Sequence, residues 1–187
     1  YDLDETSLTE YLNYGVVTSP KTIFKNNFKV EPAEIITFQL DNGYKIKKRE
    51  KYWLPENYLG NEKFRQDKFI DIFSRVVECR EKADVEVATF LSGGIDSTSI
   101  LKNLSDRKHQ VNSFSAIYED KKYDESKWSK LVADKYSNSH YSNKISDQDI
   151  AESVFKSIEI FDEPYADSST VPSYLLSKAL PHRQLIV

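Results

Sequence analysis

The most constraining feature of this sequence is a six-residue loop between a strand-like run and a helical pattern. Residues 85–91 are rich in β-branched and aromatic side chains, which favours a strand, and they lead directly into residues 92–97, SGGIDS. Apolar residues then recur at helical spacing up to Leu104, and residues 111–118 resemble a second strand. Strand, loop, helix and strand in this order predict a βαβ unit with a right-handed crossover, and hence a parallel sheet.

The loop itself favours a binding site for phosphate groups. The first turn of a helix leaves backbone N–H groups without partners and carries partial positive charge, which attracts anions. Gly93 and Gly94 let the backbone approach an anion closely, and the hydroxyls of Ser92 and Ser97 add donors at both ends of the loop. A carboxylate beside phosphate needs a cation between them, so we expect Asp96 to hold a bridging Mg²⁺.

A structural alternative exists for the same loop. Asp96 or Ser97 could simply cap a helix that follows a glycine turn. The loop is not a Walker A motif, because no Gly-Lys-Ser/Thr follows at the required spacing, and it is not a Gly-x-Gly-x-x-Gly motif. We predict the phosphate site and keep the capped turn as its alternative.

Further helices are predicted on either side of the βαβ unit. Apolar spacing within residues 61–81 predicts a helix that places one face on a core, formed by Phe64, Phe69, Ile72, Phe73, Val76 and Val77. We interpret Cys79, near its end, as a buried or partly buried structural thiol rather than a nucleophile. Helices also follow over residues 125–135 and 150–161 and near Pro172, where Ser169 or Thr170 could form the cap. Short extended segments are expected at residues 140–143 and 184–187.

The first 60 residues are rich in turn signals and β-formers. Residues 7–13 predict a short helix, capped by Thr6 or Ser7, with Glu10 completing a capping box. Residues 34–40 and 44–48 flank an Asp-Asn-Gly turn, which is typical of a hairpin. The basic run at residues 45–51 is interpreted as a solvated edge strand, with an anion site as the alternative.

Composition limits the classes of protein to which the chain can belong. The 187 residues are 39% hydrophobic, too apolar for a disordered chain, and the net charge of −4 gives no reason to expect a nucleic acid partner. No apolar stretch is long enough to cross a bilayer, and a single cysteine fits a reducing compartment. We therefore expect a cytoplasmic protein without membrane or nucleic acid partners. Because the sequence has no Met, we expect it to be an internal piece of a longer protein.

Residues 92–97 resemble the pyrophosphate loop of ATP pyrophosphatases, which several adenylating enzymes share. Other blocks narrow the resemblance. Residues 114–115, 123–126, 161–169 and 172–177 are similar to the synthetase domain of glutamine-hydrolysing asparagine synthetases. Residues 11–15, residues 21–25 and the strand before Tyr52 and Trp53 resemble the tail of that family's N-terminal glutaminase domain.

This resemblance implies an α/β fold. Residues 61–187 would be the first part of a parallel-sheet ATP-pyrophosphatase domain of the adenine nucleotide alpha hydrolase-like type. Residues 1–60 would be a β-rich remnant of an Ntn-hydrolase glutaminase domain and a linker. The resemblance also allows a homodimer.

The chemistry that the resemblance implies uses ATP and Mg²⁺. ATP would adenylate the side-chain carboxylate of aspartate and release pyrophosphate, and ammonia derived from glutamine would then displace AMP to give asparagine. The residues that match the ATP and pyrophosphate site are Leu91, Ser92, Gly93, Gly94, Asp96, Ser97 and Ala116, with Asp96 as the metal ligand. The residues that match a segment near the acceptor substrate are Asp162, Glu163, Asp167 and Ser168. This acidic segment could instead be a loop that caps the helix at Pro172.

Two departures from the family pattern limit the expected activity. The chain begins with Tyr1 rather than a nucleophilic Cys, and the acidic loop that supplies a catalytic Glu should follow Val187. We therefore expect no glutamine hydrolysis and no amide synthesis from this chain alone. Two alternatives to an asparagine synthetase stay open: a relative that amidates another carboxylate, on a sugar or a peptide, and a nucleotide-binding module without catalysis.

Overall fold

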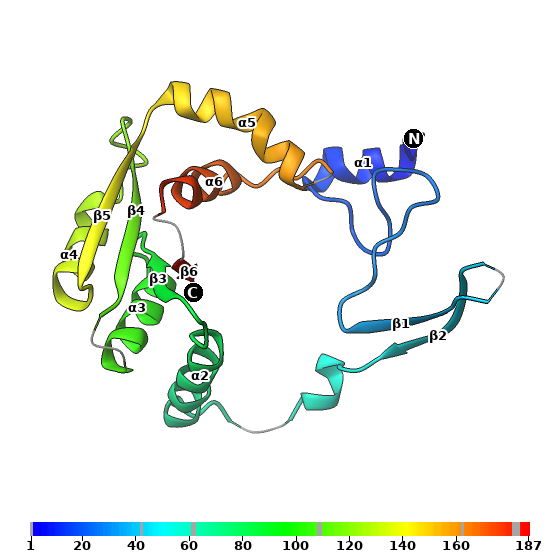
Figure 1. The fold of residues 1–187 in the computed structure, drawn as a ribbon, viewed down its shortest axis with the longest axis horizontal. Helices are drawn as coiled ribbons and strands as arrows, with labels where there is room; N and C mark the ends of the chain where they lie inside the picture. Colours follow the sequence, from blue (N-terminus) through cyan, green and yellow to red (C-terminus); the bar gives the residue numbers. More distant parts are fainter. Residues whose placement is uncertain (1, 42, 61–62, 108–109, 162, 181–183) are drawn as a thin grey trace. The chain divides into compact units, whose positions relative to one another are not determined.

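The structure is a computed structural model that describes residues 2–41, 43–60, 63–107, 110–161, 163–180 and 184–187 (Figure 1). The chain forms two compact units. The first combines Tyr1–Lys63 with Ile158–Asp167, and the second combines Phe64–Ser157 with Ser168–Val187. The assignment of residues 1–60 to a glutaminase-like domain remains a prediction.

The first unit begins with helix α1, Glu5–Tyr14. The helix starts earlier than predicted, because Asp4 is its N-cap and accepts a hydrogen bond from the backbone N–H of Ser7 at 2.8 Å. The predicted capping box does not form. Glu10 instead forms an ion pair with Lys21 at 2.6 Å, which ties α1 to the loop that follows it.

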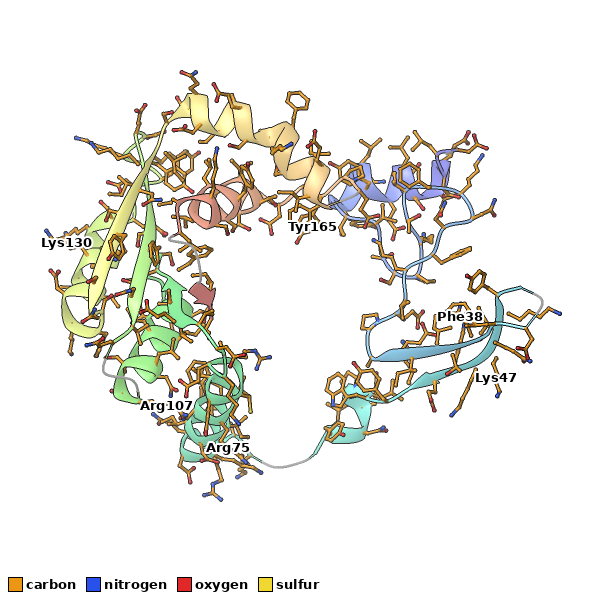
Figure 2. All side chains as sticks on the ribbon, viewed as in Figure 1. Phe38, Lys47, Arg75, Arg107, Lys130 and Tyr165 are labelled. Carbon is orange, nitrogen blue, oxygen red and sulfur yellow. The ribbon has the colours of Figure 1, made fainter. Side chains whose placement is uncertain are left out.

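Strands β1, Glu34–Gln39, and β2, Lys45–Lys51, pair antiparallel, which confirms the predicted hairpin; Asn42 of its turn lies outside the described residues. The register of the β1–β2 pairing shifts between Thr37 and Phe38. Every residue of β2 is exposed, so the basic run is a solvated strand (Figure 2). The 3-10 helix η1, Pro55–Tyr58, follows.

The second unit is built on a parallel sheet, as predicted. Its strands are β3, Glu86–Phe90; β4, Asn112–Tyr118; β5, Ser139–Ile145; and β6, Gln184–Ile186, in the order β5-β4-β3-β6. All three pairings are parallel. The chain therefore runs outward from β3 to β5 and returns to the other side of β3, which makes β3 and β6 the switch point of the topology. In open parallel sheets, ligands bind outside the carboxyl ends of the strands near such a point.

Helices cover both faces of this sheet (Figure 1). Helices α3, Ile95–Arg107, and α4, Ser126–Tyr136, cover one face, and α6, Thr170–Ala179, packs on β4 and β5 from the other. Helix α2, Gln66–Arg80, packs on α3, and α5, Asp147–Phe161, connects β5 to the segment before α6. Arg107 of α3 reinforces the α2 contact with ion pairs to Glu78 and Glu81 (Figure 2).

The core of the second unit lies between the sheet and the helices α2, α3 and α4. Its buried members are Val77, Val87, Leu91, Leu101, Leu104, Val111 and Ala133. The apolar residues at helical spacing after the loop therefore form a buried helix face, since Leu101 and Leu104 are fully buried. Burial of these side chains anchors α3 against the sheet.

Helix α2 buries less of its apolar face than predicted. Val77 is buried and Phe73 partly buried, whereas the other predicted core residues, Phe64, Phe69, Ile72 and Val76, are exposed. The prediction of a buried or partly buried Cys79 is also wrong, because this thiol is exposed. Phe73 and Val77 are one turn apart and face α3. Cys79 lies two positions beyond Val77 and therefore points away from that face.

Within the described residues, no helix combines the length and the apolar character that crossing a bilayer would require.

Helix α4 packs directly on the loop that precedes α3. Gly93 has φ +87°, and a Cβ placed there would lie 2.6 Å from the backbone of both Trp128 and Ser129. Neither the backbone conformation nor the space therefore tolerates a side chain. Gly94 differs, because its Cβ would meet only the hydroxyl of Ser92, at 3.3 Å.

Gly93→Ala should lower the free energy of unfolding of the second unit by about 2–4 kcal/mol, because it adds backbone strain and a contact that α4 can relieve only by moving. Gly94→Ala is the matched control and should cost less than about 1 kcal/mol. Urea unfolding followed by Trp128 fluorescence in a Trp53→Phe background reports on this unit alone. Equal losses in the two variants would contradict the packing described here.

His140 on β5 is a partly buried titratable group between the sheet and α4. Its Nδ1 lies 2.8 Å from the hydroxyl of Ser113, which is itself fully buried. Burial lowers the pKa of His140 below its ordinary value of 6.5, although Asp134 and the Ser113 backbone oppose this shift. The folded state therefore favours the neutral imidazole.

This shift predicts a pH-dependent stability. Because the pKa in the folded state is below that in the unfolded state, the contribution is fully present above about pH 6.5 and is lost as the pH falls through that value and then through the folded-state pKa. The urea midpoint should fall more between pH 7.5 and 5.5 for the wild type than for His140→Gln. Parallel pH dependences would show that His140 does not titrate differently on folding.

Candidate functional site

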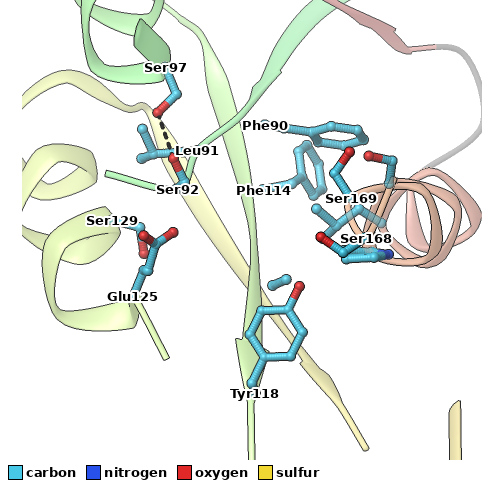
Figure 3. Close-up of a pocket in the computed structure, with 14 residues that line it drawn as sticks. Phe90, Leu91, Ser92, Ser97, Phe114, Tyr118, Glu125, Ser129, Ser168 and Ser169 are labelled. Carbon is cyan, nitrogen blue, oxygen red and sulfur yellow. Dashed lines mark hydrogen bonds between the residues drawn. The ribbon is translucent and has the colours of Figure 1, made fainter. Parts of the chain in front are cut away.

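A cavity of about 460 Å³ opens at the carboxyl ends of β3 and β4 (Figure 3). All its described lining residues belong to the second unit. Ser92 and Ser97 of the loop lie on one side and Ser168 and Ser169, at the start of α6, on the other (Figure 3). This is where the strand topology predicts a ligand site.

Hydrogen bonds within the loop hold it in a closed turn. The hydroxyls of Ser92 and Ser97 are 3.1 Å apart, and the backbone N–H of Gly94 donates to Ser92 Oγ at 3.2 Å. The Ser97 hydroxyl also lies 3.3 Å from the carbonyl oxygen of Gly94. These contacts are at the long end of the usual range, so an oxyanion could replace them at low cost. The loop therefore presents two hydroxyls to the cavity, and the N–H of Gly94 is bonded to one of them.

The strand ends supply an aromatic wall. Phe90 and Phe114 are register partners on β3 and β4, so their side chains project to the same face of the sheet. Phe114, Ala116 and Tyr118 are alternate residues of β4 and all line the cavity. The pattern i, i+2, i+4 along β4 is the signal by which the sequence alone could have indicated these aromatic residues.

Leu91 lines the cavity, and its backbone N–H and carbonyl each form one hydrogen bond with β4. Its N–H donates to the carbonyl of Phe114 at 2.8 Å, and its carbonyl accepts a hydrogen bond from the Ser115 hydroxyl. The Leu91 side chain is part of the hydrophobic core. Leu91 therefore fixes the end of β3 against β4, and its carbonyl keeps one lone pair for a ligand.

Helix α4 contributes Glu125, just before its first residue, and Ser129 to the cavity wall (Figure 3). Burial and the nearby Glu125 carboxylate raise the pKa of Tyr118 above its ordinary value. The Tyr118 hydroxyl therefore stays protonated at neutral pH and can donate a hydrogen bond.

The described lining residues of the cavity include no Lys or Arg. Among the residues that the structure describes, no group of three or more His, Cys, Asp and Glu is arranged to hold a metal. A phosphate ligand would therefore depend on hydroxyls, backbone N–H groups and the α3 N-terminus, with any cation entering together with the ligand. Mg²⁺ is commonly held in this way, by one or two carboxylates together with substrate phosphates and water.

The structure brings most of the predicted ATP-site residues together. Leu91, Ser92, Ser97 and Ala116 line the cavity. Gly93, Gly94 and Asp96 are not among its described lining residues, but they belong to the same loop and first helical turn. The carboxylate of Asp96 is exposed in that turn.

The acidic segment predicted near the acceptor is divided between the two units. Ser168 lines the cavity, whereas Glu163 forms an ion pair with Lys29 of the first unit. Asp167 also belongs to the first unit and accepts a hydrogen bond from Tyr165 at 3.5 Å. Asp162 lies outside the described residues. Ser169 occupies the N-cap position of α6, one of the two positions predicted, but its side chain makes no cap hydrogen bond. Whether the acidic residues form a capping loop stays an open alternative.

Several lining residues are absent from the sequence-based prediction. They are Phe90, Phe114, Tyr118, Glu125, Ser129, Ser169, Pro172, Ser173 and Leu176. Those on α4 and α6 come from segments distant in sequence, and only the packing of both helices at the strand ends assembles them.

Comparison with known proteins gives a consistent result. A family model described as asparagine synthase matches residues 68–187. A putative glutamine-hydrolysing asparagine synthetase 2 of Methanocaldococcus jannaschii is 30% identical over 182 residues, which cover 95% of this chain and 35% of the relative. The glutamine-hydrolysing asparagine synthetase 1 of Bacillus subtilis is 27% identical over 181 residues, which cover 95% of this chain and 28% of the relative.

The chain thus spans about a third of the length of the curated relatives that it matches. The family match begins within α2 and includes the sheet, the loop and all the residues that line the cavity. Since it covers well over half of the chain, the chain belongs to the asparagine synthase family.

Proposed function

We propose that the cavity at the carboxyl ends of β3 and β4 binds ATP with Mg²⁺, and that the chain takes part in ATP-dependent amide synthesis. The observation that carries this proposal is the position of the Ser92–Ser97 loop. It follows a central parallel strand, opens a helix and borders a cavity of about 460 Å³. Anions are favoured at such a helix N-terminus by its free N–H groups and partial positive charge.

Each part of the site would have a defined task. The loop hydroxyls and the N–H of Gly94 would bind phosphate oxygens, exchanging one hydrogen bond for another. Phe90 and Phe114 offer apolar surface to a nucleoside, which would keep water away from it. Asp96, exposed in the first turn of α3, would hold the metal ion. Bound Mg²⁺ would neutralise phosphate charge that no described lining residue can offset.

The proposed reaction is adenylation of the aspartate side-chain carboxylate, with release of pyrophosphate, followed by ammonia attack that releases AMP and gives asparagine. The relatives' names, which denote glutamine-hydrolysing asparagine synthetases, support aspartate as the acceptor and glutamine as the ammonia source. Adenylation makes the carboxylate electrophilic, because AMP is a far better leaving group than hydroxide.

Asp96→Asn should weaken Mg²⁺-dependent ATP binding at least tenfold, because the substitution removes the metal-binding charge while keeping the side chain's size. Asp106→Asn is the matched control, since Asp106 lies in the last turns of the same helix, where it forms an ion pair with Lys102. Isothermal titration with ATP in the presence of Mg²⁺ and of EDTA separates metal-dependent binding from any residual affinity. Unchanged binding by Asp96→Asn would refute the metal role.

The acceptor can be identified by pyrophosphate release from the full-length gene product, measured with aspartate and a panel of other carboxylates. We expect release that depends on aspartate and is accompanied by AMP. Release with only another carboxylate would keep the adenylation chemistry and exclude aspartate as substrate. ATP binding without any release would leave a nucleotide-binding module and contradict the proposed reaction.

A further inference from the structure

The first unit contains a cavity of its own, between the start of helix α1 and the loop that follows this helix. Its volume is about 290 Å³. The described residues that line it are Asp4, Ser7, Lys21, Thr22, Phe24, Lys25, Asn26, Asn27 and Phe28. All of them fall within the residues 1–63 that belong to the first unit, so the described wall of the cavity is formed by this unit alone.

Backbone hydrogen bonds hold the two walls of this cavity together. The N–H of Asp4 donates to the carbonyl of Ile23 at 3.0 Å, and the N–H of Lys25 donates to the carbonyl of Asp2 at 2.9 Å. Ile23, between the two bonds, is buried. The cavity is therefore preformed, which lowers the cost of ordering its walls around a ligand.

Opposite charges line the cavity without forming an ion pair with each other. Asp4, the N-cap residue of α1, contributes a carboxylate, and Lys25 contributes an ammonium group. The hydrogen bond from the Ser7 backbone N–H lowers the pKa of Asp4, and the charge of Lys25 adds to this shift. The Lys25 ammonium nevertheless has no partner among the described residues, whereas Lys21 already pairs with Glu10. A ligand that carries both a negative and a positive group could therefore pair with Lys25 and Asp4 at once.

The hydroxyl of Ser7 is a second, independent indication of a ligand. Ser7 lines the cavity and is only 1% exposed. Its hydroxyl forms no hydrogen bond with any described residue. A buried hydroxyl without a partner is costly, and a ligand oxygen that accepts its hydrogen bond would remove that cost. Phe24 and Phe28 add apolar surface for the rest of such a ligand.

We infer that this cavity binds a free α-amino acid, with the ammonium group of the ligand on Asp4 and its carboxylate on Lys25 and the Ser7 hydroxyl. The cavity volume is at the lower end of the range for ligand pockets, which suits a molecule of this size. A simple anion fits less well because Asp4 repels it, and a simple cation because Lys25 repels it. The inference goes beyond the proposed function and does not rest on ATP binding.

The test titrates the isotope-labelled full chain with each of the common amino acids in turn and follows the backbone amides of Ser7 and Lys25. At least one amino acid should shift both amides saturably. Its N-acetyl derivative, which lacks the ammonium group, and its methyl ester, which lacks the carboxylate, should bind at least roughly tenfold more weakly. Equal binding of either derivative, or of acetate or inorganic phosphate, overturns the inference. So does the absence of a saturable shift with every amino acid up to about 10 mM.

Three variants test the assigned contacts. Asp4→Asn and Lys25→Gln should each weaken binding of that amino acid roughly tenfold, because each removes one charge, and Asn still caps α1. Ser7→Ala should weaken binding without lowering the free energy of unfolding of the ligand-free chain, because the hydroxyl that it removes has no described partner. Lys47→Gln is the matched control, since Lys47 is an exposed lysine of β2 that does not line the cavity.

The control variant should bind the amino acid as the wild type does. Wild-type affinity in both Asp4→Asn and Lys25→Gln overturns the inference. A loss of stability in Ser7→Ala with unchanged affinity shows that the hydroxyl is structural and overturns its role as a ligand contact.

Discussion

The close approach of helix α4 to Gly93 is the contact on which the site depends. A positive φ and the absence of a side chain allow the chain to turn sharply after β3, so that α3 starts directly at the sheet edge. The same contact places Glu125 and Ser129, at the start of α4, in the wall of the cavity that the loop borders. One backbone contact, which only glycine permits, thus fixes the end of β3, the start of α3 and one wall of the cavity.

The electrostatics of the cavity follow from its composition. Its described lining offers hydroxyls, aromatic rings and one carboxylate, but no basic side chain. Such a site favours an anion only through backbone dipoles and an accompanying cation. Asp96 at the start of α3 fits that requirement, because a carboxylate there becomes favourable once a metal lies between it and phosphate. The dependence on the metal should therefore be stronger here than in a loop that carries a lysine.

The sequence was sufficient for the parts of the fold with local signals. The order of strand, loop, helix and strand predicted the parallel sheet, the Asp-Asn-Gly turn predicted the hairpin, and apolar residues at helical spacing predicted α3. The prediction of the buried face failed at α2, where Cys79 and Ile72 are exposed, because only packing against α3 decides which face of this helix is buried. In the site, the loop was predictable from its glycines, whereas Ser129 depends on packing between segments far apart in sequence.

The most direct test follows backbone amide resonances of the isotope-labelled chain during titration with Mg²⁺ and inorganic pyrophosphate. The proposed site predicts that the amides of Gly93, Gly94 and Ser97 shift together and saturate, whereas the amide of Gly43, in the hairpin turn of the first unit, does not shift. Saturable shifts elsewhere with the loop amides unchanged, or no saturable shift at all, would contradict the claim that this loop binds the phosphate groups of ATP.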